Sequence, residues 1–213
     1  MKLKIKCLEL NDWTENTYIV SDEDAKAIIF DPGCNDAETR KILTNYIEAN
    51  NLEVIALLNT HCHIDHILGN QFVSEKYNLP LQAHKNEVVV LDMAPMVAQM
   101  YGVSYVPSPP ISVFLESNEY KSFASMNIKM LFCPGHSPGS LCFYFDEQGF
   151  VVGGDVLFQG SIGRTDLPGG NHDDLLASIR NELFVLPGKT VVYPGHGEPT
   201  TIAIELSTNP FFN

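Results

Sequence analysis

The chain has 213 residues, of which 45% are hydrophobic, and it carries a formal net charge of −13. This length fits one domain with a large core, and no apolar run is long enough to cross a membrane as a helix. The negative charge argues against a nucleic-acid partner, because phosphate binding needs a basic face. We therefore predict a single domain over residues 1–213, with neither a nucleic acid nor a membrane as partner.

The first predicted element, at residues 2–9, alternates lysine with apolar side chains. This pattern is typical of an amphipathic edge strand and differs from the continuous apolar core of a signal peptide. The five cysteines are scattered through apolar stretches, which favours reduced core thiols over a disulfide framework. Both observations predict a cytoplasmic protein.

Apolar stretches and helical spacing then predict the remaining elements in chain order. Strands are expected at 17–21, 26–31, 53–59, 81–83, 127–132, 141–146, 150–153 and 190–193. Helices are expected at about 36–50, 66–77, 85–100 and 171–183, with Asp36 as the cap of the first. The early strands pair in sequence and the later ones mix with helices, which favours two mixed sheets packed face to face with helices outside.

The densest group of metal-ligating side chains follows the strand predicted at 53–59. His61, His63, Asp65 and His66 stand within six residues, in the run Thr-His-Cys-His-Ile-Asp-His. In extended backbone His61 and His63 project to the same side, and a turn before the next helix brings Asp65 and His66 beside them. Imidazole and carboxylate are the usual ligands of a hydrolytic transition metal. Two such pairs indicate two adjacent metals more strongly than a polar surface cluster.

Three more candidate ligands stand in separate glycine-rich loops, each at the end of a predicted strand. His136 lies in Pro-Gly-His-Ser-Pro-Gly-Ser, Asp155 in Gly-Gly-Asp, and His196 in Pro-Gly-His-Gly. Glycine lets the backbone take positive φ and approach a neighbour closely. A lone loop histidine is more often solvated than a ligand, but together these residues complete the set that two four- or five-coordinate metals need.

Two further residues are candidates for bracing the ligands. Metal-bound histidines usually donate their other ring N–H to a carboxylate or a carbonyl, and Asp31, at the end of the strand predicted at 26–31, is the carboxylate best placed to accept. A turn-forming aspartate before Pro32 and Gly33 is an equally good interpretation. Thr60 could brace the histidine motif through its hydroxyl.

These motifs resemble the metallo-β-lactamase-fold hydrolase superfamily. The phrases around His136 and Asp155, together with Gly-Arg-Thr-Asp at 163–166, resemble its glyoxalase II-like branch, that is, single-domain hydroxyacylglutathione hydrolase-like proteins. The similarity runs from about residue 16 to 212. It implies an α+β fold, a four-layer αββα sandwich (the metallo-β-lactamase fold), with two divalent metal ions at one edge of the sheets. Zn²⁺ is expected, and Fe or Mn is admissible because such sites discriminate poorly.

Carried over residue by residue, the resemblance implies two ligand sets with one shared member. His61, His63 and His136 would hold one metal; Asp65, His66 and His196 would hold the other. Asp155 would bridge the two. The β-lactamases of this fold characteristically carry a cysteine ligand at the position of Asp155, so we do not expect antibiotic hydrolysis.

The expected chemistry follows from the metals. A hydroxide held between two dications is a nucleophile near neutral pH, because metal binding lowers the pKa of water from about 16 towards 7. A carbonyl beside one metal is polarised, and its oxyanion is stabilised there. We therefore predict a metal-dependent thioester hydrolase acting on S-lactoylglutathione or a related small acyl thioester. Asp65 and Asp155 would be the catalytic ligands of the metal-bound hydroxide, which fits the lack of a Gly-x-Ser-x-Gly nucleophile motif.

The substrate is less well defined by the sequence. Arg164 could pair with a substrate carboxylate, or it could form a structural salt bridge with Asp166. Residues 93–110 are rich in Met, Tyr and Pro. They could form a flexible lid or a pocket wall over the metals, or a core helix with a proline-rich exit.

Three other functions stay open. A mono-iron persulfide dioxygenase on the same fold also carries Gly-Arg-Thr-Asp, and lactone or phosphoester hydrolysis needs the same metals. A non-catalytic binding module is disfavoured, because the ligand set is complete. Metal analysis separates the classes, with two metals, one iron or none expected per chain.

Overall fold

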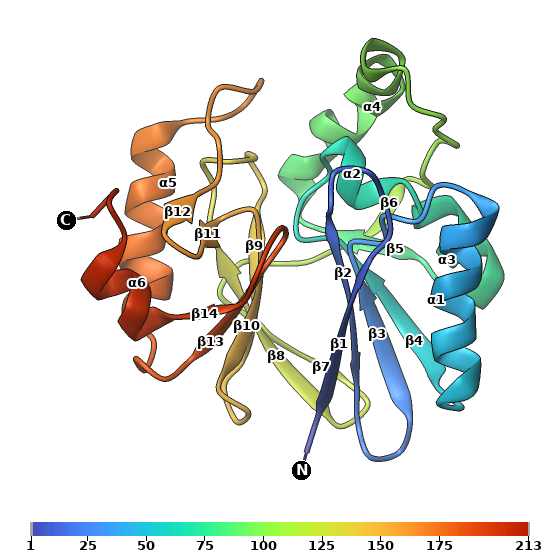
Figure 1. The fold of residues 1–213 in the computed structure, drawn as a ribbon, viewed down its shortest axis with the longest axis horizontal. Coiled ribbons are helices and arrows are strands. Elements are labelled where there is room, and N and C mark those ends of the chain that lie inside the picture. The colour runs from blue at the N-terminus through green and yellow to red at the C-terminus, as the bar shows by residue number, and fades with distance from the viewer. Residues whose placement is uncertain (1, 213) are drawn as a thin grey trace.

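The computed structural model describes residues 2–212. Within that range the main strands form two six-stranded sheets that face each other, with helices on the outer side of each (Figure 1). The strand order is β1-β2-β3-β4-β5-β6 in the first sheet and β14-β13-β10-β9-β8-β7 in the second. The predicted α+β class and the four-layer αββα sandwich are confirmed.

The first sheet is built from the N-terminal half of the chain. Its strands are β1 (Lys4–Glu9), β2 (Asn16–Ser21), β3 (Lys26–Phe30), β4 (Glu53–Leu58), β5 (Leu81–Ala83) and β6 (Ile111–Phe114). The pairs β1–β2 and β2–β3 are antiparallel, whereas β3 to β6 run parallel. Parallel neighbours need crossovers, and α1 (Ala37–Ala49) supplies the one from β3 to β4. Asp36 caps α1 as predicted, because its carboxylate accepts the Thr39 N–H in a capping box.

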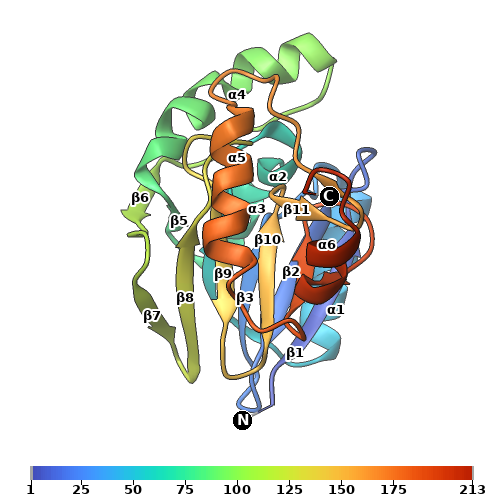
Figure 2. The same ribbon diagram turned by 90° about the vertical axis from the view of Figure 1, so that its left-hand side faces the viewer.

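The second sheet comes from the C-terminal half. Its strands are β7 (Tyr120–Phe123), β8 (Met126–Phe132), β9 (Leu141–Phe145), β10 (Phe150–Gly154), β13 (Val191–Pro194) and β14 (Thr200–Thr201). The short strands β11 (Leu157–Phe158) and β12 (Ser161–Ile162) form a separate hairpin. Helix α5 (His172–Ser178), its π-helical continuation Ile179–Leu183 and α6 (Ile202–Thr208) lie on the outer side of the sheet (Figure 2).

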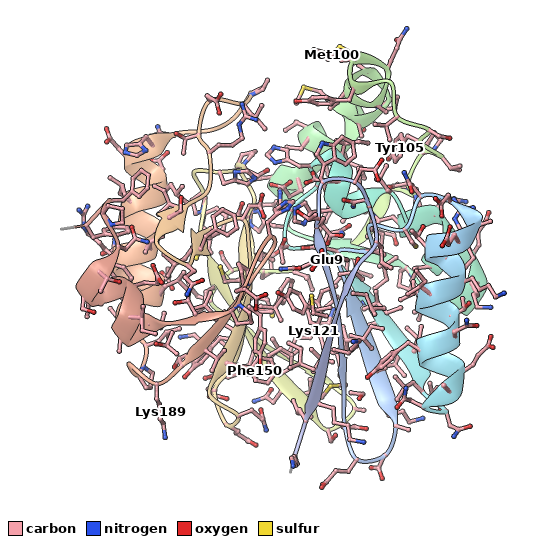
Figure 3. All side chains as sticks on the ribbon, in the orientation of Figure 1. Glu9, Met100, Tyr105, Lys121, Phe150 and Lys189 are labelled. Atoms are coloured by element: carbon pink, nitrogen blue, oxygen red, sulfur yellow. The ribbon has the colours of Figure 1, made fainter. Side chains whose placement is uncertain are left out.

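The central strands are apolar on both sides because both of their faces are covered. In β3, Ile28 and Phe30 belong to the cluster between the sheets, and Ala27 and Ile29 belong to the cluster under the helices. Alternate side chains of one strand therefore fill two different layers. Figure 3 shows the side chains filling the space between the sheets, with Phe150 among them.

The helix predicted at 66–77 is in fact two helices, α2 (Ile64–Ile67) and α3 (Asn70–Tyr77). Gly69 lies at the break, where its N–H donates to the Pro32 carbonyl and where a Cβ would meet the Cys34 side chain. Asp65 and His66 consequently lie inside the first helical turn instead of in a turn before the helix. That part of the prediction is wrong.

Other elements were missed because they are short. Strands β6, β7, β11, β12 and β14 and helix α6 have no counterpart in the prediction. The segment predicted as one helix at 85–100 is a 3₁₀ turn, Lys85–Glu87, that continues into α4 (Val88–Tyr101). Between residues 2 and 212 we find no helix long and apolar enough to cross a bilayer.

Candidate metal centre

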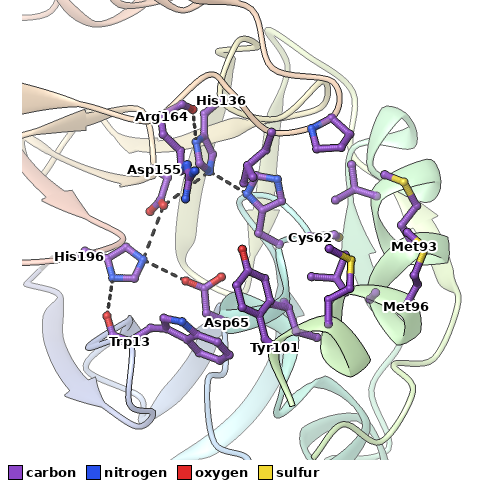
Figure 4. A pocket seen from close by; sticks show the side chains of 18 of the residues that line it. Trp13, Cys62, Asp65, Met93, Met96, Tyr101, His136, Asp155, Arg164 and His196 are labelled. Carbon is purple, nitrogen blue, oxygen red and sulfur yellow. Dashed lines mark hydrogen bonds and ion pairs between the residues drawn. The ribbon is translucent and has the colours of Figure 1, made fainter. Parts of the chain in front are cut away.

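The seven predicted metal ligands lie together at the edge of the two sheets where β4, β8, β10 and β13 end. They form two compact clusters and one carboxylate beside both. Within each cluster the ligand atoms lie within 4.8 Å of one another; the clusters are His61, His63 and His136, and Asp65, His66 and His196. Figure 4 shows the carboxylate, Asp155, between His136 and His196.

Each sheet contributes ligands to the site. His61 and His63 follow β4 of the first sheet, whereas His136 lies between β8 and β9 of the second. Asp155 comes directly after β10, at a position where a Cβ on the neighbouring Gly195 would collide with its Oδ1. Glycine at 195 is therefore required by the close approach of the two loops.

In the first cluster the ring nitrogens point at one another. His136 Nε2 lies 2.8 Å from His63 Nδ1 and 3.2 Å from His61 Nε2. His136 Nδ1 lies 2.8 Å from the carbonyl of Arg164, which can only accept, so this nitrogen carries the proton. The Nε2 lone pair of His136 then faces the other two rings, as metal coordination requires.

The second cluster has the same polarity. His196 Nδ1 donates to the Trp13 carbonyl at 3.0 Å, which leaves the Nε2 lone pair 3.1 Å from Asp65 Oδ2. His66 Nδ1 donates to Asp31 Oδ2 at 3.1 Å, and its Nε2 lies 3.7 Å from the same Asp65 oxygen. Ring nitrogens and carboxylate oxygens thus face one another. Burial alone would lower the pKa of His66 and His196, but the nearby carboxylates outweigh it and raise both values, so a cation between these groups, a proton or a metal, is stabilised.

Asp155 is oriented toward both clusters at once. Its Oδ1 lies 3.4 Å from His66 Nε2, and its Oδ2 lies 3.5 Å from His136 Nε2 and 3.6 Å from His196 Nε2. His66 Nε2 and Asp155 Oδ1 are buried without a hydrogen-bond partner among the described residues. Such orphaned polar atoms are costly, and two divalent metals would satisfy them. The residues therefore fit a binuclear metal site.

The pKa shifts agree with neutral rings at the first cluster. Burial and the neighbouring His136 lower the pKa of His63 to about 3, and burial together with His66 and His63 lowers the pKa of His61. Burial alone would raise the pKa of Asp155, but the nearby histidines outweigh it and hold the value below its ordinary range. A neutral imidazole and an ionised carboxylate are the forms that bind metal.

Asp31 is connected by hydrogen bonds to one histidine of each cluster. Its Oδ2 accepts from His66 Nδ1 at 3.1 Å and from the Thr60 hydroxyl at 2.6 Å. Because that hydroxyl donates its single hydrogen bond to Asp31, its oxygen accepts from His61 Nδ1, 3.0 Å away. One carboxylate thus sets the tautomer of a histidine in each cluster, and Asp31 and Thr60 stand where they were expected to brace the ligands.

Two buried glutamates near the site were not anticipated. Glu15 has no exposed surface, and its Oε1 lies 3.9 Å from His66 Nδ1. Glu87 is equally buried and accepts hydrogen bonds from the Cys62 N–H, the Ser137 hydroxyl and the Gly139 N–H. In sequence each is a single glutamate with no metal-ligand spacing, so no local pattern marks it.

A cavity of about 630 Å³ opens beside the ligands. Its far wall is α4, which presents Met93, Met96, Val97, Met100 and Tyr101. Figure 4 shows Met93 and Met96 across the cavity from His196 and Asp155. The stretch 93–101 is therefore a helical pocket wall, whereas residues 102–110 do not line the cavity.

Arg164 also borders the cavity, with its side chain mostly exposed. Its guanidinium makes two hydrogen bonds of 2.7 Å to the carboxylate of Asp166. The structural salt bridge that was one of the two interpretations of Arg164 is thus present. The main-chain carbonyl of Arg164, independently of the side chain, fixes the His136 tautomer.

Comparisons with known proteins agree with this geometry. A model of the metallo-beta-lactamase superfamily matches residues 10–196. The chain is 32% identical over 213 residues to the hydroxyacylglutathione hydrolase GloC of Haemophilus influenzae, and this match covers 99% of each of the two chains. Other relatives, up to 40% identical, bear the name probable metallo-hydrolase.

Two solved structures are similar to the chain in both fold and sequence. A protein described as the BLEG-1 B3 metallo-beta-lactamase superposes with a TM-score of 0.91 at 37% identity, covering 99% of this chain and 100% of its own. TTHA1623 in a di-iron-bound form superposes with a TM-score of 0.87 at 34% identity, covering 97% and 99%. The chain therefore belongs to the metallo-β-lactamase superfamily and is a metal-dependent hydrolase.

Proposed function

We propose that the chain is a binuclear thioesterase of the glyoxalase II type, which hydrolyses S-lactoylglutathione or a related small acyl thioester. The observation that carries the proposal is the position of Asp155, between two His/Asp clusters at the mouth of a cavity of about 630 Å³. The similarity to GloC over the whole chain supports the thioester as the substrate class.

The bound metals would supply a water of lowered pKa and a Lewis acid for the carbonyl oxygen. His61, His63 and His136 would hold one of them, and Asp65, His66 and His196 the other, with Asp155 shared. The protein's own part is orientation: the carbonyls of Arg164 and Trp13 keep the protons of His136 and His196 on Nδ1. A thiolate leaving group needs little protonation, so the site requires no separate general acid.

A substrate panel on metal-loaded protein tests the proposal. We expect acyl thioesters, S-lactoylglutathione included, to be hydrolysed with a higher kcat/KM than a lactone, a phosphodiester or a β-lactam. Full activity should coincide with close to two metals per chain, with zinc expected and iron or manganese admissible. Turnover of glutathione persulfide with oxygen consumption, and one iron per chain, would contradict the proposal and favour the dioxygenase.

β-Lactam hydrolysis is the second candidate because one similar structure is described as a B3 metallo-beta-lactamase. The expectation that Asp155 in place of cysteine excludes this activity stays a prediction. The β-lactam member of the panel therefore decides between the two. A higher kcat/KM for the β-lactam than for every thioester would replace the proposal.

The same panel addresses Arg164. If its guanidinium exchanges Asp166 for a substrate carboxylate, Arg164→Ala should raise KM for S-lactoylglutathione more than it lowers kcat. An exposed ion pair contributes only about 0–1 kcal/mol to stability, and the Arg164 carbonyl that holds His136 is retained, so the variant should fold normally. An acyl thioester without carboxylates is the control, and its KM should not change.

A further inference from the structure

The cavity beside the metal ligands is apolar on the side away from them. Helix α4 places Met93, Met96, Val97 and Met100 at i, i+3, i+4 and i+7, which is one face of a helix. The adjoining positions Val90, Ala94 and Ala98 are buried in the core, and Val90 and Ala94 also line the cavity. The methionine face is partly solvent-exposed, with Met96 56% and Met100 76% exposed.

The rest of the rim continues this surface. Trp13, from the loop between β1 and β2, packs edge-on against Tyr101 at the end of α4, with ring centroids 6.0 Å apart. Leu167 and Pro168 border the cavity from the opposite segment. Methionine side chains are flexible and polarisable, so they adapt to apolar chains of varied shape.

Polar groups that could hold a charged substrate are scarce here. Apart from the predicted metal ligands, the lining that the structure describes offers one charged side chain, Arg164, which already pairs with Asp166. Glutathione carries two carboxylates and an ammonium group, and the chain as a whole is strongly negative. Buried carboxylates without partners are costly, so the tripeptide gains little from this wall.

We propose that this cavity binds an apolar chain attached to the scissile carbonyl, so that the preferred substrates are thioesters of apolar acyl groups or of apolar thiols. The proposal rests on the thioesterase function proposed above. Oxygen atoms of the reacting group would lie at the metal ligands, and the chain would lie along the Met93 to Met100 face of α4. Turnover would then grow with chain length, because the buried methylenes contribute binding free energy.

The single tryptophan of the sequence gives a readout independent of turnover, since Trp13 lines the cavity. Saturated carboxylates from butanoate to decanoate would be titrated into metal-loaded protein while Trp13 fluorescence is recorded. We expect the Kd to fall about fourfold per methylene, which corresponds to about 0.8 kcal/mol per buried CH₂. A Kd that does not change with length overturns the proposal.

Two variants assign the effect to α4. Met96→Gln combined with Met100→Gln makes the wall polar at exposed positions, so it should flatten the dependence of Kd on length. Val89→Gln, on the same helix, 59% exposed and outside the cavity, is the matched control and should keep the wild-type dependence. If the Kd falls equally steeply with carboxylate length in the wild type and in both variants, the alkyl chain does not bind along α4.

Turnover then separates the two sources of the chain and the two proposals. One thioester series varies the acyl group and the other varies the thiol, and the series with the steeper rise in kcat/KM identifies the bound side. Hydrolysis that is equally fast for all lengths, or fastest for S-lactoylglutathione, overturns the pocket assignment but keeps the thioesterase. If the Kd falls steeply with chain length but no thioester is hydrolysed, the pocket assignment is kept and the thioesterase proposal is overturned.

A second inference comes from Glu87, which lies at the junction of the 3₁₀ turn and α4. Its Oε2 accepts the Cys62 N–H at 2.7 Å, between His61 and His63. Its Oε1 accepts the Ser137 hydroxyl at 2.6 Å and the Gly139 N–H at 2.7 Å, in the loop that carries His136. A Cβ on Gly139 would lie 2.9 Å from Glu87 Cγ, so glycine permits this approach.

Through Glu87 the three bonds connect a loop of the first sheet with a loop of the second. Cys62 follows β4 of the first sheet, whereas Ser137 and Gly139 connect β8 and β9 of the second. The relative position of His61, His63 and His136 depends on how these two loops face each other. We infer that Glu87 is a positioning residue, which holds the two ligand loops at the spacing that a metal requires.

Glu87→Gln tests this inference, because an amide of the same size must turn its NH₂ toward one of three donors. We expect about a tenfold weaker metal affinity at the His61, His63 and His136 cluster, measured by competition with a chromophoric chelator. Glu205→Gln is the matched control: Glu205 is also fully buried and accepts from Thr200, the Gly160 N–H and Asn209, but in α6.

The control separates positioning from general stability. Glu205→Gln should lower the thermal stability and leave metal affinity unchanged. If both variants lose the same metal affinity, or if Glu87→Gln binds metal like the wild type, the inference is wrong. Should Glu87→Gln fail to fold, Ser137→Ala removes one of the three bonds, and an unchanged metal affinity in that variant would likewise contradict the role of Glu87.

Discussion

Asp155→Ala should lower kcat/KM by about a thousandfold and reduce the metal content from close to two per chain to one or fewer. Asp155 is the residue whose two oxygens face different clusters, with Oδ1 near His66 and Oδ2 near His136 and His196. Metal catalysis contributes several kcal/mol of transition-state stabilisation, and each 1.36 kcal/mol is a factor of ten in rate. Loss of the shared ligand therefore affects both metals at once.

Elemental analysis and kinetics on the same preparation check this expectation. Asp146→Ala is the control, because Asp146 is an exposed aspartate between β9 and β10 and belongs to neither ligand cluster. It should keep two metals and wild-type turnover. A variant lacking the Asp155 carboxylate that still holds two metals and turns over normally would show that the bridge is misassigned.

The convergence of the candidate ligands could be predicted from the sequence because they follow apolar strands. Asp155 stands directly after a buried apolar strand, and His61, His136 and His196 follow such strands after a few residues. Strand ends of packed sheets meet at common edges, so residues far apart in sequence arrive at one place. The chemistry of imidazole and carboxylate then indicates metal without knowledge of the fold.

Glu87 could not be found in this way. A glutamate between Asn86 and Val88 at a helix start usually faces solvent, and here the residue is fully buried. Its burial depends on donors 25 and 52 residues away, at Cys62 and Gly139, and no local pattern encodes those contacts. The same applies to the break at Gly69, which is explained by the approach of Pro32 and Cys34.

The pocket wall was predictable in composition but not in role. The methionines of α4 could equally have faced the core, since helical spacing alone does not say which of two apolar faces is covered. Val90, Ala94 and Ala98 are the buried residues of α4, in the same core cluster as side chains of β3 and β4. Val90 and Ala94 also border the cavity, beside Met93, Met96 and Met100.

Asp31→Asn should weaken metal binding in both clusters by about 100-fold, the upper end of what residues behind metal ligands contribute. An asparagine tolerates the left-handed backbone that Asp31 adopts, with φ of 47°. Its oxygen can keep the bonds from the Thr60 N–H and the Asn59 amide. Its NH₂ must then take the place of Oδ2, which in the wild type accepts from Thr60 Oγ1 and His66 Nδ1.

Replacing this oxygen by an NH₂ group changes which ring nitrogen of His66 and of His61 carries the proton. His66 Nδ1 would have to accept, so its proton would move to Nε2, which faces Asp65 and Asp155. The Thr60 hydroxyl, accepting from the amide, would donate to His61 Nδ1, so the proton of His61 would move to Nε2 as well. Both rings would then present N–H groups where a metal needs lone pairs.

The measurement is metal affinity by chelator competition, together with the histidine tautomers from ¹⁵N NMR of the metal-free protein. Asp22→Asn is the matched control, because Asp22 is also buried and accepts from the Asp24 and Lys26 N–H groups and from Ser125. Both variants should lose about 1–3 kcal/mol of stability, but Asp31→Asn alone should lose metal and shift the tautomers. If His61 and His66 keep their protons on Nδ1 in Asp31→Asn while metal affinity still falls, Asp31 acts through packing and not through the tautomers. Unchanged affinity would remove Asp31 from the metal centre and leave it as the turn-forming residue of the Asp-Pro-Gly sequence.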